Sequence, residues 1–240
     1  MERETVIVTG GSVGIGRGLV ERLARDGLTV VNLDHAPPAQ AHANEVFVAC
    51  DLADRAALDG VLASVVARHR PTRLVANAGI ARPRGFAETT LADFDAVMAV
   101  NVGSFVACAQ ALLPTMRAAG FGRVVAISSR AALGKADRAA YAASKAALHG
   151  LVRTMAIELG GAGVTVNAVA PGPIDTPAFR AANPPGSPAR ARIEANVAVG
   201  RMGTPGDVAG AVAFLLGTEA GFVTGQTLYV CGGLSIGAAR

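Results

Sequence analysis

The chain has 240 residues, of which 51% are hydrophobic and only 4% aromatic, and its formal net charge is +4. A chain of this length can bury one sizeable core, and its many alanines and glycines favour helices packed closely on a sheet over an aromatic-rich β-sandwich. We therefore expect one α/β domain over residues 1–240. The 22 basic residues are interspersed with 18 acidic ones, and without a long basic run they do not indicate a nucleic-acid-binding arm.

The cysteines and histidines do not follow the spacing of a disulfide framework or a metal site. Three cysteines lie far apart and are odd in number, and four histidines show no ligand spacing. The first residues lead directly into an expected strand, and the sequence shows neither a secretory signal nor an apolar run long enough for a membrane span. These features predict a cytoplasmic protein without a metal, nucleic-acid or membrane partner.

A short β-branched strand, residues 5–9, opens the chain, and a glycine-rich turn joins it to a helix. In this turn Gly10 permits a tight bend, Gly14 lets the backbone approach a pyrophosphate, and Gly16 lets the helix pack on the strand. The N-terminus of the helix adds unpaired N–H groups and the positive end of the helix dipole. Strand, turn and helix together predict a dinucleotide-binding site.

Further strands follow in regular alternation with helices, which predicts a Rossmann-type, doubly wound, seven-stranded parallel sheet. The second strand ends in Asp34, whose carboxylate can accept hydrogen bonds from both ribose hydroxyls of a dinucleotide. Right-handed crossovers bring the carboxyl ends of all strands to one edge, where the site is expected. The expected strands are residues 5–9, 28–33, 45–49, 73–76, 123–127, 164–169 and 227–230.

A tyrosine and a lysine lie four residues apart in the segment Tyr141-Ala-Ala-Ser-Lys145, which is expected to be helical. Side chains at this spacing share one helical face, so the ammonium can favour the tyrosinate. On its own the pattern is typical of an amphipathic helix with a half-buried tyrosine. Only two of the 22 basic residues are lysines, however, and lysine is the compact cation with a tunable pKa. A lysine at position 145 therefore favours the interpretation of Tyr141 and Lys145 as a catalytic pair.

Asn101 and a group of arginines each keep two interpretations from the residues alone. Asn101 lies between apolar residues in an expected helix, where hydrogen bonding to backbone and a catalytic role are both open. Residues 176–200 contain Asn183-Pro-Pro-Gly-Ser-Pro188, which excludes a single helix and predicts a lid or substrate loop. A group of arginines is either solvated or meets an anionic group of the substrate: Arg82, Arg84, Arg180, Arg190 and Arg192.

An ordered set of motifs makes the whole chain resemble the classical short-chain dehydrogenase/reductase family. The resemblance implies a Rossmann-fold, nicotinamide-dependent oxidoreductase, commonly a homotetramer, that acts on an alcohol or carbonyl. The motifs are Thr9-Gly-Gly-Ser-Val-Gly-Ile-Gly16, Asn77-Ala-Gly79, Asn101, Ser128-Ser129, Tyr141-Ala-Ala-Ser-Lys145 and Pro171-Gly-Pro-Ile-Asp-Thr176.

The resemblance also implies roles for single residues. Tyr141 would exchange a proton with the substrate oxygen, Lys145 would lower the pKa of the phenol and hold the nicotinamide ribose, and Ser129 would bind the substrate oxygen. Asn101 would anchor a water relay to Lys145. The cofactor-binding residues would be Gly10, Ser12, Gly14, Ile15, Gly16, Asp34, Asp51, Leu52, Asn77, Gly79, Tyr141, Lys145, Pro171, Ile174 and Thr176.

The catalytic serine is ambiguous, because the spacing from the tyrosine that is common in the family falls on Ser128. The position at the strand end instead points to Ser129, which requires a one-residue deletion within residues 130–138. We favour Ser129 and leave Ser128 open. A second departure is Ala76, which takes the place of the first asparagine in the usual Asn-Asn-Ala-Gly motif.

The leading hypothesis is an NAD-dependent oxidoreductase that interconverts a secondary alcohol and a ketone. A 2′-phosphate would meet the like charge of Asp34, and the positions that NADP-using relatives often make basic are here Val13 and His35. One alternative is an NADPH-dependent 3-oxoacyl carrier-protein reductase, although such reductases often carry basic docking residues at the positions of Gly120 and Ala162. An alternative of another class is a catalytically silent sensor or scaffold, against which the intact serine, tyrosine and lysine argue.

Overall fold

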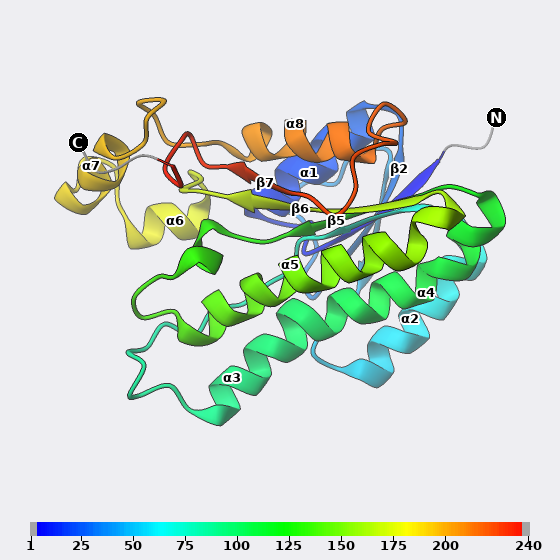
Figure 1. Ribbon diagram of the computed structural model, residues 1–240, viewed down its shortest axis with the longest axis horizontal. Helices are drawn as coiled ribbons and strands as arrows, with labels where there is room; N and C mark the ends of the chain where they lie inside the picture. Colours follow the sequence, from blue (N-terminus) through cyan, green and yellow to red (C-terminus); the bar gives the residue numbers. More distant parts are fainter. Residues whose placement is uncertain (1–3, 237–240) are drawn as a thin grey trace.

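Seven parallel strands form the centre of the protein, in the spatial order β3-β2-β1-β4-β5-β6-β7 (Figure 1). The computed structural model describes residues 4–236. The predicted parallel sheet is confirmed, with small differences in bounds: β2 runs from Thr29 to Asp34, β5 begins one residue earlier, at Gly122, and β6 continues to Pro171. The strands are β1 (Thr5–Thr9), β2 (Thr29–Asp34), β3 (Glu45–Ala49), β4 (Arg73–Ala76), β5 (Gly122–Ile127), β6 (Val164–Pro171) and β7 (Thr227–Val230).

Helices cover both faces of this sheet (Figure 1). The helices α1 (Gly14–Arg25) and α8 (Pro205–Leu216) pack together on one face. The other face carries α2 (Arg55–His69), α4 (Ser104–Ala119) and α5 (Ala139–Leu159). Because successive strand residues point to opposite faces, Val6 and Val8 of β1 join the core under α1 and α8, while Ile7 joins the core on the other side. The central strands are therefore apolar on both faces.

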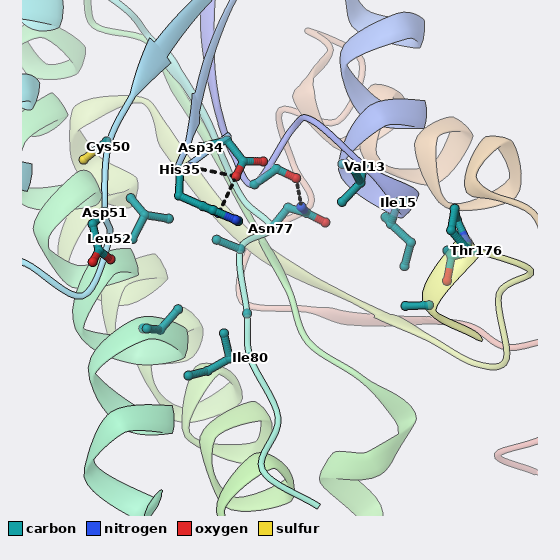
Figure 2. A pocket seen from close by; sticks show the side chains of 18 residues that line it. Val13, Ile15, Asp34, His35, Cys50, Asp51, Leu52, Asn77, Ile80 and Thr176 are labelled. Carbon is teal, nitrogen blue, oxygen red and sulfur yellow. Dashed lines mark hydrogen bonds and ion pairs between the residues drawn. The ribbon is translucent and has the colours of Figure 1, made fainter. Parts of the chain in front are cut away.

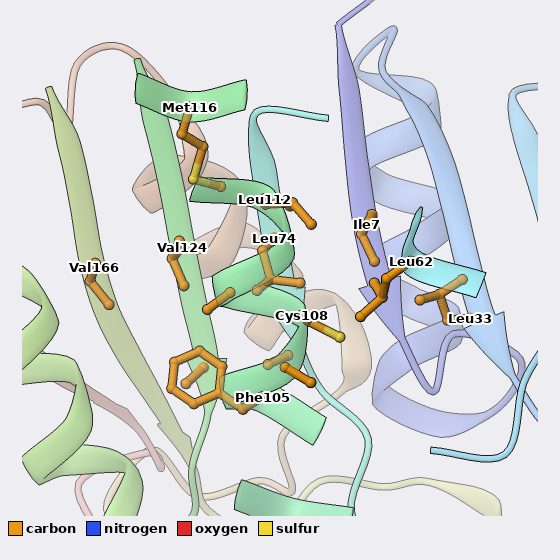
Figure 3. Packing of buried hydrophobic residues seen from close by; sticks show 14 of the residues in the cluster. Ile7, Leu33, Leu62, Leu74, Phe105, Cys108, Leu112, Met116, Val124 and Val166 are labelled. Atoms are coloured by element: carbon orange, nitrogen blue, oxygen red, sulfur yellow. The ribbon is translucent and has the colours of Figure 1, made fainter. Parts of the chain in front are cut away.

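The longest helical run joins α3 (Leu91–Met98), the π-helical turn η1 (Ala99–Gly103) and α4. This run, Leu91–Ala119, is long and apolar enough by composition to cross a membrane, so the expectation that the sequence lacks such a run was wrong. Half of the most apolar 18-residue stretch of this run is buried inside the protein. Phe105, Leu112 and Met116 of α4 pack against the sheet (Figure 3), which accounts for the apolar composition of the run.

Residues 176–200 contain two short helices, α6 (Pro177–Ala182) and α7 (Pro188–Ala195). Each helix begins with a proline, and the residue before that proline caps the helix with its hydroxyl. The Thr176 hydroxyl accepts from the N–H of Phe179, and the Ser187 hydroxyl accepts from the N–H of Arg190. The prolines and glycine between them prevent a continuous helix. The remaining short elements are the 3₁₀ turns η2 (Arg130–Leu133) and η3 (Gly160–Ala162).

Candidate active site

Two adjoining cavities lie at the carboxyl edge of the sheet. The glycine-turn cavity, of about 630 Å³, is formed by the turn after β1, the ends of β2, β3 and β4, and the start of α6 (Figure 2). The tyrosine cavity, of about 770 Å³, is formed by η2, the loop before α5, the end of β6, and α6 and α7. Gly79, Ile80 and Ala178 line both cavities. The two spaces therefore meet at the end of β4.

The backbone of the glycine turn requires residues without a side chain. Gly10 and Gly14 have φ angles of +67° and +59°, in the left-handed region that favours glycine. A Cβ atom on Gly16 would lie 1.8 Å from the carbonyl oxygen of Gly10. Val13, the residue before α1, provides no side-chain cap, so the first N–H groups of α1 keep their capacity for a ligand. The turn forms a cradle for an anionic group.

A buried polar network supports the turn from below, and the sequence analysis missed it. Asn32 accepts from the N–H of Gly11 at 2.9 Å and donates to Ser12 Oγ at 3.1 Å and Glu45 Oε1 at 2.9 Å. Arg17 of α1 holds both oxygens of Glu45, at 3.1 and 2.9 Å. Burial alone would raise the pKa of Glu45, but these hydrogen bonds bring it below its usual value. The available signal was an asparagine inside the apolar strand β2.

Asp34 lies at the rim of the glycine-turn cavity with its carboxylate already engaged (Figure 2). It accepts from the N–H of Ser12 at 3.0 Å and from that of His35 at 2.8 Å, and the His35 ring nitrogen Nδ1 lies 2.9 Å away. The hydroxyl of Ser12 is buried and donates to the carbonyl of Ala36 at 2.7 Å. Ser12 thus contributes to the shape of the turn rather than to the cavity wall.

Asn77 connects the end of β4 to the same turn. Its side-chain amide donates to the carbonyls of Thr9 and Gly10, at 3.0 and 2.9 Å. The hydroxyl of Thr9 accepts in return from the N–H groups of Asn77 and Ala78. Two strand ends are therefore locked together beneath the cavity, and Gly79 follows where a Cβ atom would lie only 3.2 Å from Lys145 Nζ.

Ser129 and Tyr141 line the tyrosine cavity together. Burial raises the pKa of Tyr141 above its usual value, while a side-chain hydrogen bond from Ser129 and the charge of Arg138 act in the opposite direction. Lys145 Nζ lies 5.7 Å from the centre of the Tyr141 ring and donates to the carbonyl of Ile127 at 2.7 Å. Burial outweighs these two opposing contributions, and the lowering of the phenol pKa by Lys145 that the resemblance implies stays a prediction.

Ser128, the alternative serine, is buried on the opposite side of the chain from the cavity. Its hydroxyl donates to the carbonyl of Lys145 at 2.9 Å and lies 2.8 Å from His149 Nε2. Successive residues at a strand end point to opposite sides, so only one serine of the pair can face the cavity. In this structure that residue is Ser129.

Lys145 and Asn101 lie behind the cavity walls, each only 3% exposed. Burial lowers the pKa of Lys145 to about 8. Asn101 lies in the π-helical turn η1, where its side chain accepts from the N–H of Ile80 at 2.8 Å and donates to the Ile80 carbonyl at 3.0 Å and to Ser144 Oγ at 2.9 Å. Its amide therefore fixes Ile80, which lines both cavities, and π turns are common at functional sites.

None of the five arginines singled out in the sequence lines the tyrosine cavity. Arg84 pairs with Asp93 at 3.1 Å, and Asp175 pairs with Arg180 at 3.1 Å and with Arg190 at 2.8 Å. Arg82 and Arg192 are exposed. These positions therefore do not support the hypothesis that one of them meets a substrate anion.

The predicted site residues divide into three groups. Those that line the glycine-turn cavity are Gly10, Gly14, Ile15, Gly16, Asp34, Asp51, Leu52, Asn77, Gly79 and Thr176. Those that line the tyrosine cavity are Gly79, Ser129, Tyr141 and Pro171. Buried outside both walls lie Ser12, Asn101, Lys145 and Ile174. Within residues 4–236, no group of three or more histidine, cysteine or acidic side chains could hold a metal ion.

Comparison with known proteins agrees with this arrangement. A family model described as "Enoyl-(Acyl carrier protein) reductase" matches residues 10–235. The chain is 36% identical to (2S)-((R)-hydroxy(phenyl)methyl)succinyl-CoA dehydrogenase subunit BbsD of Thauera aromatica, over 98% of each chain. It is 35% identical to the 3-oxoacyl-(acyl-carrier-protein) reductase FabG of Escherichia coli strain K12, over 97% of this chain and 98% of that protein.

The solved structures include one with a very similar fold. It is a protein assigned as an NAD(P)-dependent gluconate 5-dehydrogenase from Beutenbergia cavernae, with NADP bound at low occupancy. It superposes with a TM-score of 0.87 at 35% identity and covers 96% of each chain. The family match and the fold agree with the ordered motifs of the sequence. The chain therefore belongs to the classical short-chain dehydrogenase/reductase family of oxidoreductases.

Proposed function

We propose that this oxidoreductase interconverts a secondary alcohol and a ketone with NAD, and that Tyr141 is its acid/base. The observation that carries the proposal is that Ser129 and Tyr141 line one cavity, which meets the glycine-turn cavity at Gly79. A proton donor and a hydrogen-bond donor thus lie beside the space that suits a dinucleotide. Both groups must reach one substrate oxygen for this chemistry.

The glycine turn fits a dinucleotide. Its cradle depends on Gly16, where a side chain would collide with the Gly10 carbonyl, and the N-terminus of α1 suits a pyrophosphate. Asp34 would meet the adenosine ribose, Asp51 and Leu52 the adenine, and Thr176 the nicotinamide carboxamide. A bound nicotinamide supplies or accepts the hydride.

The residues of the chain itself handle the proton. In the direction of ketone reduction, Tyr141 donates its phenolic proton to the substrate oxygen while Ser129 donates a hydrogen bond to the same oxygen. In the direction of alcohol oxidation, Tyr141 takes the proton back. Burial raises the pKa of Tyr141, so its phenol carries the proton that the reducing direction requires. Lys145 and Asn101 act from behind the wall by holding the Tyr141 helix and Ile80 in place.

NAD rather than NADP is proposed as the cofactor. Support comes from Asp34, whose negative charge lies at the cavity rim, and from Val13, which is uncharged and lines the same cavity. His35 lies 2.9 Å from Asp34 with its ring 84% exposed. The NADP in the Beutenbergia cavernae structure means that a similar fold can hold the other dinucleotide, so the preference rests on these particular residues.

A second candidate function is reduction of a 3-oxoacyl carrier-protein thioester with NADPH. It is favoured by the 35% identity to the Escherichia coli 3-oxoacyl-(acyl-carrier-protein) reductase. The positions where such reductases often carry basic docking residues are Gly120, which ends α4, and Ala162 in η3. Acetoacetyl thioesters with NADPH therefore belong in any test of the activity.

Homotetrameric assembly and a cytoplasmic location are part of the proposal. Support for assembly comes from large apolar side chains left on the surface of the chain, including Ile157 (84% exposed) and Phe222 (103% exposed). The strand β7 also forms an open edge of the sheet. Analytical ultracentrifugation of the purified protein tests the assembly, and a monomer at micromolar concentration would contradict it.

The activity is tested by following NAD(P)H absorbance with wild-type protein and a panel of alcohols, ketones and acetoacetyl-CoA. We expect turnover with NAD(H) on a secondary alcohol or ketone, and loss of roughly 10³-fold or more in Tyr141→Phe because the proton donor is gone. NADH binding, measured by fluorescence, stays unchanged in that variant. Binding without turnover of any compound would instead favour a sensor, and turnover confined to thioesters with NADPH would favour the second candidate.

A further inference from the structure

The wall of the tyrosine cavity contains three cations and no acidic residue. Arg130, Lys135 and Arg138 all line it. All three come from residues 130–138, the connection between β5 and the helix that carries Tyr141. We infer that this cationic wall selects a substrate that carries a negative charge, as a carboxylate or a phosphate, on the molecule whose hydroxyl or carbonyl reacts at Tyr141. The inference rests on the proposed function and specifies its substrate class.

The three cations differ from Arg84, Arg180 and Arg190 because no acidic side chain pairs with them. Among the described residues, none of the three forms an ion pair within 4 Å. The one acid in the connection, Asp137, is exposed, and Arg138 reaches only its backbone carbonyl, at 3.0 Å. Unlike Arg84, Arg180 and Arg190, the wall therefore keeps its capacity for a ligand anion.

The position of the wall is fixed by backbone contacts rather than by the charges themselves. Arg84 N–H donates to the carbonyl of Asp137 at 3.2 Å, and Arg84 and Arg138 form an isolated parallel bridge. Asp137 takes a φ of +58° at this bend. The other end of the connection is held by Ser129, whose hydroxyl accepts from the N–H of Ala131 at 3.1 Å. Like charges are thus held near one another at a defined place.

These positive charges affect the pKa values of the groups around them. Partial desolvation, and then the charges of Arg138 and Arg130, lower the pKa of Lys135. The charge of Arg138 also opposes the rise that burial causes in the pKa of Tyr141. An anion that entered the cavity would relieve the repulsion and gain charge-assisted hydrogen bonds, including a fork from arginine that suits a carboxylate or phosphate.

Besides Ser129, Tyr141 and Asn183, the remaining lining residues are glycines, alanines, prolines and larger apolar residues, several of them on α6, α7 and the segment after β7. Phe179, Ile193 and Leu234 contribute there, and Ile80 contributes at the end of β4. In Figure 1 the connection after β5 lies beside α6 at the same edge of the sheet. The fitting substrate therefore has an apolar body and an anionic end directed to residues 130–138.

The test compares charged ketones with neutral partners of nearly the same shape. The probes are acetoacetate, 4-oxopentanoate and 5-oxohexanoate, each with its methyl ester, and hydroxyacetone phosphate with hydroxyacetone. We expect kcat/KM for at least one charged probe to exceed that of its neutral partner by roughly 10- to 100-fold, the size of one or two charge-assisted contacts. The ratio falls as salt is added, because the wall is partly open to solvent. The phosphate pair separates a phosphate preference from a carboxylate preference.

The triple variant Arg130→Gln/Lys135→Gln/Arg138→Gln removes the charges and keeps polar side chains. Its ratio of charged to neutral probe falls to about one, and taking the ratio cancels any common effect on Tyr141. The matched controls are Arg82→Gln and Arg192→Gln, which remove exposed arginines outside the cavity and keep the wild-type ratio. Thermal melting of each variant confirms that it is folded.

Failure of this inference and failure of the proposed function give different results. Equal use of acids and esters by wild-type protein, or an unchanged ratio in the triple variant, overturns the charged-substrate inference and leaves the oxidoreductase proposal standing. If no probe is turned over, calorimetric titration of the same pairs into NADH-loaded protein still measures the charge preference. If a charged probe binds more tightly than its neutral partner and this difference is lost in the triple variant, the charged-substrate inference is supported. Equal binding of the two probes, or no binding, overturns the inference.

Discussion

The two cavities at the carboxyl edge differ in how their polar groups are used. Around the glycine turn, Asp34, Asn77 and the underlying Asn32 each have protein partners. Around Tyr141, the three cations of residues 130–138 have no acidic partner within the described chain. The first cavity is therefore shaped in advance by internal hydrogen bonds, whereas the second keeps charges for a ligand to satisfy. A site for a common cofactor can be fixed, while a site for a particular substrate must discriminate.

Substitution of the two serines that follow β5 should give very different losses of activity. Ser129→Ala should lower kcat by roughly 10²–10³-fold, because it removes a donor to the reacting oxygen. Ser128→Ala should change kcat only a few-fold, since its hydroxyl bonds to Lys145 and His149, but should lower the free energy of unfolding by about 1–2 kcal/mol. Steady-state kinetics and chemical denaturation measure the two effects. A larger loss of kcat in Ser128→Ala would reassign the catalytic serine.

A substitution that changes the shape of the glycine turn should leave the fold intact but weaken the binding of the cofactor. In Gly16→Ala the new methyl group would lie on the Gly10 carbonyl, so the turn must shift, and we expect the dissociation constant of NADH to rise roughly 10- to 100-fold. Gly60→Ala in α2 is the control, because a Cβ atom there meets nothing within 4 Å. Fluorescence titration measures both. Unchanged affinity in Gly16→Ala would show that the turn does not hold the dinucleotide.

Burial of the charged Lys145 side chain beneath both cavities should lower the free energy of unfolding. Its folded pKa of about 8 lies below the ordinary 10.5, so the unfolded chain binds more protons between these values and the free energy of unfolding rises with pH across that window. At pH 7 the full penalty of about 3 kcal/mol applies. Lys145→Met removes it but loses the bond to Ile127, so we expect a net gain of roughly 2 kcal/mol together with loss of activity.

The pH dependence provides the control for this prediction. Urea denaturation between pH 7 and 10 should show the rise in wild-type protein and a flatter profile in Lys145→Met. Lys135, the other lysine of the chain, is exposed, and Lys135→Met should shift stability by less than about 0.5 kcal/mol. A less stable Lys145→Met variant at pH 7 would mean that the ammonium is stabilised where it lies.

The smallest expected effect concerns the choice of dinucleotide. Asp34→Asn keeps an acceptor for the N–H of Ser12 and removes the negative charge, so the preference for NADH over NADPH should fall by roughly tenfold. Adding Val13→Arg, at a side chain that is 70% exposed, should lower it further. The ratio of kcat/KM for the two cofactors is the measurement. Equal use of both by wild-type protein would contradict the role given to Asp34.

The fold and most of the glycine-turn cavity could be predicted from the sequence alone. Alternating apolar strands and helices dictate a parallel sheet, and the carboxyl ends of parallel strands must meet at one edge. Residues there, such as Asp34 and Asn77, could be placed from their position in the chain alone. The two candidate serines could also be identified, because both directly follow β5.

Contacts between distant segments set which side each strand-end residue faces and which charges are paired. Ser128 and Ser129 are adjacent in sequence, but only the latter faces the cavity, because the end of β5 packs on α5 on one side. The arginines of α6 and α7 were expected to be either solvated or near a substrate anion, yet Asp175 pairs with both Arg180 and Arg190, while three cations of residues 130–138 line the cavity. Burial likewise set the pKa of Lys145. Pairing and burial depend on contacts between segments distant in the chain, so local spacing cannot reveal them.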